Sequence, residues 1–309
     1  MFSLAYPQKT LLISFSLLAT IATSCTAQQY YYEDFETAEI GDLVNTVGIG
    51  GALGALEIQN VGVDESNGFQ VPPIDNFWIG SFLPETVCLK EVGQRLTLAV
   101  DAKVDLFSID SFFSNEYNVL FDFALVVTGV VSFAQFAITD DALQFTTGQF
   151  HGFGSTVSED FQPTTAIGMN SAPGSSEYFR FQWDILKLTE SSFCSLTSVF
   201  NKNGELLSQG SFAVDEIGED LGSPTNVILT MVAHFASQSI SFDNIRIQVT
   251  NENWLAGDMN NDGLRTLLDV EPFVQLIVDG RYQPEGDINF DCKVDLLDIS
   301  GFVELLSAD

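Results

Sequence analysis

Acidic side chains near the C-terminal end of the chain recur at a fixed spacing. Residues 257–280 align with residues 286–309 at an offset of 29, and ten of the 24 aligned positions are identical. Each copy contains a 12-residue stretch, 258–269 or 287–298, that begins and ends with Asp and has Asp or Asn at positions 3 and 5. This spacing is typical of a loop that wraps one hard cation in oxygen ligands.

Calcium suits such loops because it takes about six to eight oxygen ligands in a flexible geometry. The predicted ligands of the first loop are Asp258, Asn260, Asp262, the Leu264 carbonyl, Thr266 and Asp269. Those of the second loop are Asp287, Asn289, Asp291, the Lys293 carbonyl, Asp295 and Asp298. The sequence thus predicts two calcium ions, the alternative being an acidic tail that is merely solvated.

A helix is expected after each loop, over residues 267–278 and 296–306. Apolar residues at helical spacing mark one face of each helix. These residues are Leu267, Val270, Phe273, Val274 and Ile277, matched by Leu296, Ile299, Phe302, Val303 and Leu306. Neither helix can bury such a face alone, so we expect the two units to pack against each other.

Paired loops that end in Asp, each followed by a single helix, resemble type I dockerins. The resemblance covers residues 257–309 and implies two calcium ions and docking to a cohesin module on a scaffold or cell surface. The chain departs from that pattern at Cys292, where position 6 is normally Gly, and at two Leu-Leu pairs, 267–268 and 296–297, where cohesin-binding dockerins are often polar. The alternative partners are a different surface receptor or the chain's own β domain.

The body of the chain, from Tyr30 to about Val249, alternates apolar and polar residues with a period of two. Alternation of this kind, interrupted by Gly, Ser, Asn and Pro, predicts many short strands. The predicted strands include residues 96–106, 119–127, 130–138, 142–150, 179–185, 193–200 and 227–235. We expect an antiparallel jelly-roll β-sandwich over residues 28–250, joined by a linker at 251–256 to a small α-helical dockerin-like domain. A change of phase near residues 243–244 predicts a β-bulge in the last strand.

The two ends of this β region resemble those of secreted concanavalin A-like, or LamG-like, jelly rolls. The matching segments are residues 33–36 (Glu-Asp-Phe-Glu) and 241–247 (Ser-Phe-Asp-Asn-Ile-Arg-Ile). The resemblance implies that the first and last strands pair. Related sugar-binding jelly rolls also hold structural calcium where these strands meet, which implies a third ion near Asp243 and one of Glu33, Asp34 and Glu36.

Sugar binding is a further expectation, because an exposed indole can stack on a pyranose ring. Trp78 follows Pro72-Pro73 and is expected on or beside a loop, the alternative being a Trp that closes the edge of the core. Polysaccharide is therefore one candidate ligand of the β domain.

Catalysis is not predicted. Glycoside hydrolysis needs two carboxylates across a groove, and no strand carries the Glu-x-Asp-x-x-Glu pattern of jelly-roll glucanases. The acidic stretch 215–220 contains Gly and is followed by Gly and Pro, so it is expected to be a solvated loop. His151 and His234 stand in different β segments without a Ser or Cys nucleophile motif. The alternatives are a secreted glycoside hydrolase or lyase carrying a dockerin, and a structural surface or matrix component.

Export is expected from residues 1–27, where Lys9 precedes the apolar run 11–23 and small residues end at Ala27. This is the layout of a secretory signal cleaved after Ala27, the alternative being a lipid anchor on Cys25. In an oxidising compartment Cys88 and Cys194 are expected to form a disulfide, the alternative being two buried free thiols. No later segment reaches 18 consecutive apolar residues, so no membrane span is predicted.

Charge excludes some partners. With 42 Asp and Glu against 11 Lys and Arg, the formal net charge is −31. Such a chain repels phosphate, so nucleic acid and anionic lipid are not expected as partners. Since 46% of the residues are hydrophobic, the chain can nevertheless bury a large core.

Overall fold

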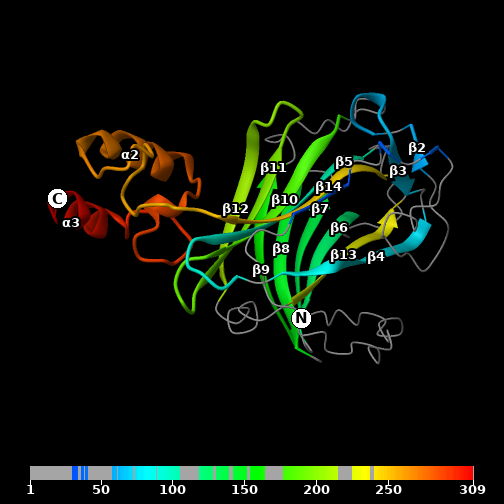
Figure 1. The fold of residues 1–309 in the computed structure, drawn as a ribbon, viewed down its shortest axis with the longest axis horizontal. Coiled ribbons are helices and arrows are strands. Elements are labelled where there is room, and N and C mark those ends of the chain that lie inside the picture. The colour runs from blue at the N-terminus through cyan, green and yellow to red at the C-terminus, as the bar shows by residue number, and fades with distance from the viewer. Residues whose placement is uncertain are drawn as a thin grey trace.

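The protein is mainly β, and its strands form two antiparallel sheets (Figure 1). This computed structural model describes residues 30–33, 36–37, 39–40, 58–60, 62–71, 74–87, 89–104, 118–127, 130–138, 142–151, 154–163, 177–214, 225–236 and 240–308. The expected export segment 1–27 and the acidic stretch 215–220 lie outside these ranges.

The first sheet has eight strands in the order β12-β11-β10-β5-β14-β3-β2, with β1 also paired to β14. Its strands are β1 Tyr30–Glu33, β2 Ile58–Gln59, β3 Gly68–Val71, β5 Gln94–Val104, β10 Phe179–Lys187, β11 Phe193–Phe200, β12 Leu206–Val214 and β14 Ile240–Asn251. Pairing of Tyr30 with Gln248 confirms that the first and last strands meet. The register of β14 against β5 shifts between Asp243 and Arg246, which confirms the predicted bulge.

The second sheet has six strands in the order β4-β13-β6-β7-β8-β9. They are β4 Ile74–Val87, β6 Asn118–Val127, β7 Val130–Ile138, β8 Ala142–His151, β9 Gly154–Pro163 and β13 Thr225–Ala236. Each neighbouring pair is antiparallel. The sequence period predicted β6, β7, β8 and β13, whereas β4 and β9 have weaker alternation and were not predicted.

The first sheet has two different faces. On one face, Phe181, Trp183 and Ile185 of β10 are at most 1% exposed, because their apolar side chains alternate with polar ones along the strand. On the other face, β10 carries Arg180 and Gln182 toward one end and apolar Leu186 toward the other. Cys194 and Leu196 of β11 pair across from Leu186 and Asp184, so they extend the apolar end of this face.

The two α-helices within the described residues lie in the C-terminal region and are α2 Val270–Asp279 and α3 Ile299–Ala308. Both lie at one end of the molecule, past β12 (Figure 1). A short 3-10 turn, Leu267–Asp269, leads into α2, and a second one, Pro284–Gly286, precedes the second acidic loop. Each predicted helix therefore exists, although α2 and α3 each begin three residues later than expected.

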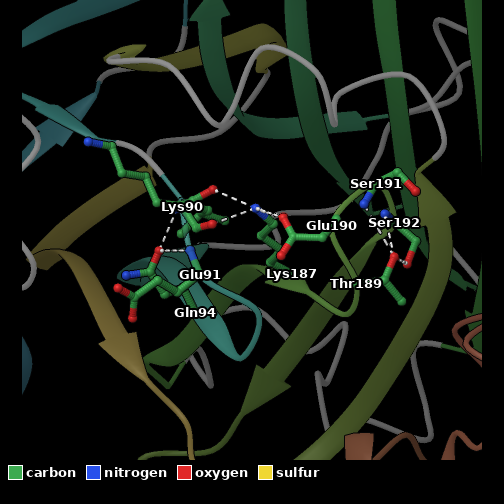
Figure 2. A network of polar contacts seen from close by, with 9 residues as sticks. Lys90, Glu91, Gln94, Lys187, Thr189, Glu190, Ser191 and Ser192 are labelled. Carbon is green, nitrogen blue, oxygen red and sulfur yellow. Dashed lines mark hydrogen bonds and ion pairs between the residues drawn. The ribbon is translucent and has the colours of Figure 1, made fainter.

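A polar network ties two turns of the first sheet together (Figure 2). The buried ammonium of Lys187 donates to the carbonyl oxygens of Lys90 at 2.7 Å and Leu89 at 3.4 Å. Gln94 accepts the backbone N–H groups of Lys90 and Glu91 through one side-chain oxygen. These bonds fix the entry to β5 beside the end of β10, which is the end of the sheet where the C-terminal region packs.

Candidate functional site

The two acidic loops follow the same backbone course. In the first loop, residues 258–269, Asn261 and Gly263 have φ values of 57° and 85°. The residues 29 positions later in the second loop, residues 287–298, are Phe290 and Cys292, with φ values of 60° and 65°. Left-handed backbone at both pairs places sharp turns at equivalent points. The repeat in the sequence is thus also a repeat in the structure.

The first residue of each loop is held by the backbone at the loop's centre. Asp258 accepts the N–H groups of Asp262 at 3.1 Å and Gly263 at 2.8 Å, one on each carboxylate oxygen. In the second loop, Asp287 likewise accepts the N–H groups at positions 5 and 6, both at 3.0 Å. These bonds fold each loop around the carboxylate of its first residue.

The last residue of each loop closes the ring. Asp269 accepts the N–H of Asn260 at 3.1 Å through one oxygen and that of Thr266 at 2.7 Å through the other. Asp298 accepts the N–H of Asn289 at 3.2 Å and that of Asp295 at 2.9 Å in the same way. The predicted ligands at positions 1 and 12 therefore both belong to one hydrogen-bonded ring in each loop.

Position 9 has a role that the sequence did not predict. The Thr266 hydroxyl accepts the N–H of Leu268 at 3.1 Å, and a carboxylate oxygen of Asp295 accepts that of Leu297 at 2.7 Å. Thr266 is the N-cap of the turn that leads into α2, where a side-chain oxygen satisfies an otherwise free N–H. Both side chains expected to contact the ion thus also start the following helical segment.

Four loop carboxylates are buried. Asp258, Asp269, Asp287 and Asp298 are at most 3% exposed. Among the described residues, none of the four has a Lys or Arg partner within 4 Å. Burial raises the pKa of Asp287 to about 6, and repulsion by Asp298 acts in the same direction. A buried negative charge is costly unless a cation compensates it.

The donor set fits a hard cation better than a soft one. The predicted side-chain ligands of both loops carry only oxygen donors, which suits Ca²⁺. Within the described ranges, no three His, Cys, Asp or Glu side chains are grouped closely enough to hold a metal ion. The predicted ligand set of each loop also includes an Asn side chain, Asn260 or Asn289, and a backbone carbonyl.

The two helices meet through a stacked aromatic pair. The rings of Phe273 and Phe302 lie 4.0 Å apart and are nearly parallel, and both side chains are 2% exposed. Ile277 and Leu306 pack partly buried beside them. Contact between these apolar residues of the two helices confirms the prediction that the two units pack together.

The other half of the predicted face is exposed, so that part of the prediction was wrong. Apolar side chains project into solvent at four pairs of positions related by the offset of 29. Three of these pairs belong to the predicted face: Leu267 and Leu296, Val270 and Ile299, and Val274 and Val303. The fourth pair, Leu268 and Leu297, lies outside the predicted face and is exposed as well. We call these eight side chains the duplicated apolar surface. The helical period marked them as apolar, but a period does not reveal how wide the buried strip is.

The C-terminal region also packs against the first sheet. Leu186, Leu188, Cys194 and Leu196 of the sheet share one buried cluster with Met259, Phe273, Tyr282, Cys292, Val294 and Phe302. The backbone N–H of Tyr282 donates to the Gln209 side chain of β12 at 2.8 Å. The predicted linker, residues 251–256, also contacts the first sheet and the shared cluster. Asn251 is the last residue of β14, the side chain of Glu252 forms an ion pair with Arg95 at 2.8 Å, and Trp254 packs on the shared cluster.

Only one cysteine of the predicted Cys88–Cys194 disulfide lies within the described residues. Cys88 lies outside them, whereas Cys194 is a buried free thiol. Burial raises the pKa of the Cys194 thiol well above its ordinary value, and the neighbouring Cys292 thiol acts in the same direction. The sequence alone marks Cys292 only as a departure from Gly. Its contact with β11 could not be predicted, because the residues in contact are far apart in the chain.

Trp78 lies in strand β4, where it pairs with Val232, and not on a loop as expected. Its side chain lies outside the description, so sugar stacking stays a prediction.

His151 pairs with Val130 and His234 with Asn76, on different strands of the second sheet. Asp215, Glu216, Glu219 and Asp220, the acidic stretch considered for catalysis, lie outside the described residues, as do Cys25 and Asp34.

The expected third cation position contains one buried carboxylate. Asp243 is 1% exposed and accepts the Val63 N–H at 2.9 Å and the Ser66 hydroxyl at 3.0 Å. Glu36 accepts the N–H of Asn67 at 2.8 Å, at the end of the same turn. Both carboxylates therefore hold the backbone of residues 63–67. A third calcium ion stays a prediction, because the side chain of Glu33 lies outside the description.

No family model matches the sequence, and no curated protein matches it. Several solved structures are similar in shape at low sequence identity. One is the CBM2 module of the evolved Dit of Lactobacillus casei BL23 phage J-1, with 11% identity and a TM-score of 0.45 over 74% of this chain and 100% of that one. Another is lectin I from Ulex europaeus in complex with the methyl glycoside of alpha-L-fucose, with 7% identity and a TM-score of 0.41 over 73% and 99%.

A third similar structure is the lectin from Bauhinia forficata in complex with GalNAc, with 9% identity and a TM-score of 0.41 over 74% of this chain and 100% of that one. The architecture given above follows from strand pairing, and these distant neighbours add nothing to it. None of the helices in the described part of the chain is long and apolar enough to cross a membrane.

Proposed function

We propose that the chain is a secreted, non-catalytic extracellular protein whose residues 257–309 form a calcium-dependent docking module. The two-sheet β domain would be the part that this module attaches to a surface or scaffold. Its proposed partner is a cohesin-like receptor, as the resemblance to type I dockerins implies. The receptor would present an apolar surface to the Leu-Leu pairs 267–268 and 296–297, because cohesin-binding dockerins are often polar at these positions.

The observation that carries the proposal is the duplicated apolar surface. Leu267 and Leu296 are 83% and 72% exposed, and Leu268 and Leu297 are 70% and 71% exposed. Single exposed apolar residues are common, but grouped ones mark interaction sites. Here apolar residues are exposed at equivalent positions in both copies of the repeat. They lie on the turn that leads into each helix and on the helix itself. A docking partner would cover them.

The loop geometry supports the calcium part of the proposal. In both loops the carboxylates of the first and last residues are buried, hydrogen-bonded to the loop backbone and without a described cationic partner. Asp258, Asn260, Asp262 and Asp269 would hold one ion, and Asp287, Asn289, Asp291 and Asp298 the other. A bound Ca²⁺ would supply the positive charge that these carboxylates lack. The turn that carries Leu267 and Leu268 ends at Asp269, so metal binding and the docking surface would be coupled.

The experiment is a binding measurement of the full chain on an immobilised type I cohesin, in calcium and in excess chelator. We expect binding in calcium alone. The Leu267→Asp/Leu296→Asp double variant should lose at least about tenfold in affinity, which corresponds to about 1.4 kcal/mol. Val278→Asp is the matched control, because Val278 is 73% exposed on the same helix but has Ser307 at the equivalent position of the second copy.

Equal binding by the double variant and the wild type would contradict the assigned surface. Absence of binding to a panel of cohesins in calcium would contradict the proposed partner. The non-catalytic part is tested separately by screening polysaccharides for hydrolysis or elimination. Turnover that disappears on mutation of a carboxylate pair would favour a secreted glycoside hydrolase or lyase instead.

A further inference from the structure

Two buried thiols from distant parts of the chain meet where the second loop packs on the first sheet. Cys194 is the second residue of β11, and Cys292 is position 6 of the second loop. Both are free and at most 1% exposed. Cys194 and Cys292 belong to the same buried cluster. The Cys292 thiol also donates to the carbonyl of Phe193 at 3.5 Å, immediately before Cys194 in the strand.

The backbone conformation of Cys292 is unfavourable for a residue with a side chain. Its φ is 65°, in the left-handed region, where the Cβ of an L-residue is too close to the following carbonyl oxygen. The equivalent residue of the first loop is Gly263, and a Cβ added there would meet nothing within 4 Å. The second loop thus carries a thiol at a position where the first loop needs no side chain, and that thiol reaches into the cluster shared with the sheet.

We propose that Cys194 and Cys292 form a disulfide that locks residues 257–309 onto the first sheet in an oxidising compartment. The electrons go to a small-molecule disulfide such as oxidised glutathione. One cysteine thiolate attacks that disulfide and releases one reduced glutathione, which leaves a mixed disulfide. The second cysteine thiolate then displaces the remaining glutathione from the first cysteine's sulfur. The two protons lost by the protein thiols end on the two released glutathiones.

This bridge has a different consequence from the predicted Cys88–Cys194 pair. It would join the β domain to the calcium module and not two segments of the β domain. The docking module would then stay attached to its own sheet at the second loop, while the duplicated apolar surface remains on its outer side. Formation of the bond needs no calcium, so it can be tested apart from the proposed function.

The test is disulfide mapping of the full chain after folding in oxidised glutathione. The protein is unfolded in the presence of iodoacetamide, digested without reduction and examined by mass spectrometry. We expect one peptide pair that joins Cys194 to Cys292, absent after reduction. Cys88→Ser should keep this pair. A pair that contains Cys88 or Cys25 with Cys194, or alkylation of both Cys194 and Cys292, would overturn the proposal.

A second measurement guards against a variant that fails to fold. Cys292→Gly restores the residue type of the first loop and removes both the thiol and the cost of its left-handed backbone. The midpoint of guanidinium unfolding should be higher for oxidised than for reduced wild-type protein, and oxidation should leave the midpoint of Cys292→Gly unchanged. An equal effect of oxidation on both proteins would overturn the proposal. A chain that binds calcium but lacks the bridge would leave the proposed function intact.

Discussion

Asp184 shows how differently single carboxylates are placed in this acidic chain. It lies in β10 and is 2% exposed. Its carboxylate accepts hydrogen bonds from the Thr97 hydroxyl at 2.5 Å and from the Gln182 side-chain amide at 2.7 Å. Burial raises its pKa, although the charge of Arg95 and these two hydrogen bonds oppose that rise. Folding therefore favours the protonated carboxyl. The contribution of Asp184 to stability is fully present below its unfolded pKa and is lost as pH rises through its folded pKa.

Asp184→Asn should consequently change the pH dependence of stability. Asn imitates the protonated carboxyl, so the variant should gain stability over the wild type as pH rises from about 4 to 7. Urea unfolding at several pH values measures this difference. Glu190→Gln is the control, because the Glu190 side chain is 89% exposed and should show no such trend. A wild type that becomes more stable than Asp184→Asn as pH rises would contradict the burial argument.

At the scale of residues, the 12-residue spacing predicted which loop carboxylates lie together better than it predicted their neighbours, and their role as calcium ligands stays a prediction. Asp258, Asp269, Asp287 and Asp298 take the ring positions that the 12-residue spacing predicts. The spacing could not reveal that Cys292 meets Cys194, because that contact depends on how the second loop packs on a strand almost a hundred residues away.

At the scale of elements, α2 and α3 depend on one aromatic contact. Phe273 and Phe302 stack at 4.0 Å, and they are the fully buried side chains of their helices. Isolated helices of ten residues are marginal in water, so tertiary packing must supply most of their stability. The stacked pair is therefore the main internal contact of the C-terminal module.

Phe302→Ala should destabilise the C-terminal module by about 3–5 kcal/mol, because it removes a buried aromatic side chain and leaves a cavity. Helical circular dichroism during thermal unfolding measures the loss. Val303→Ala is the neighbouring control, since Val303 is 54% exposed and should cost far less. Equal effects of the two substitutions would mean that the stacked pair does not hold the helices together.

The predicted helices differ from the observed ones in what they bury. Their apolar residues cover more of the circumference than the partner helix can bury, which leaves the duplicated apolar surface exposed. Among the strands, β7 and β11 were predicted with their observed bounds because no Gly, Pro, Asn or Asp interrupts either run. β4 and β9 were missed because Pro, Gly and acidic residues interrupt their patterns.

At the scale of the whole molecule, the two predicted domains share a core. Leu186, Leu188 and Leu196 of the sheet pack with residues of both loops and both helices. The sequence predicted a mainly β region followed by a helical module, which the structure confirms. It left open whether the module packs on its own β domain, because a period indicates which face is apolar and not what covers that face.

The shared core also decides how the module is best studied. Residues 257–309 alone would expose Met259, Tyr282 and Val294, which the sheet helps to bury. Measurements of calcium binding therefore belong on the full chain, where the packing of the second loop is intact.

The most direct test of the account is a calorimetric calcium titration of the full chain after removal of metal by chelation. We predict that the two loops account for two calcium equivalents, so Asp258→Ala and Asp287→Ala should each bind one equivalent fewer than the wild type. Asp279→Ala, which removes an aspartate at the end of α2 outside both loops, should bind as many as the wild type. Helical circular dichroism should fall in chelator and return with calcium, because ion binding compensates the buried carboxylates. Absence of calcium binding, together with equal helicity in calcium and in excess chelator, would contradict the account.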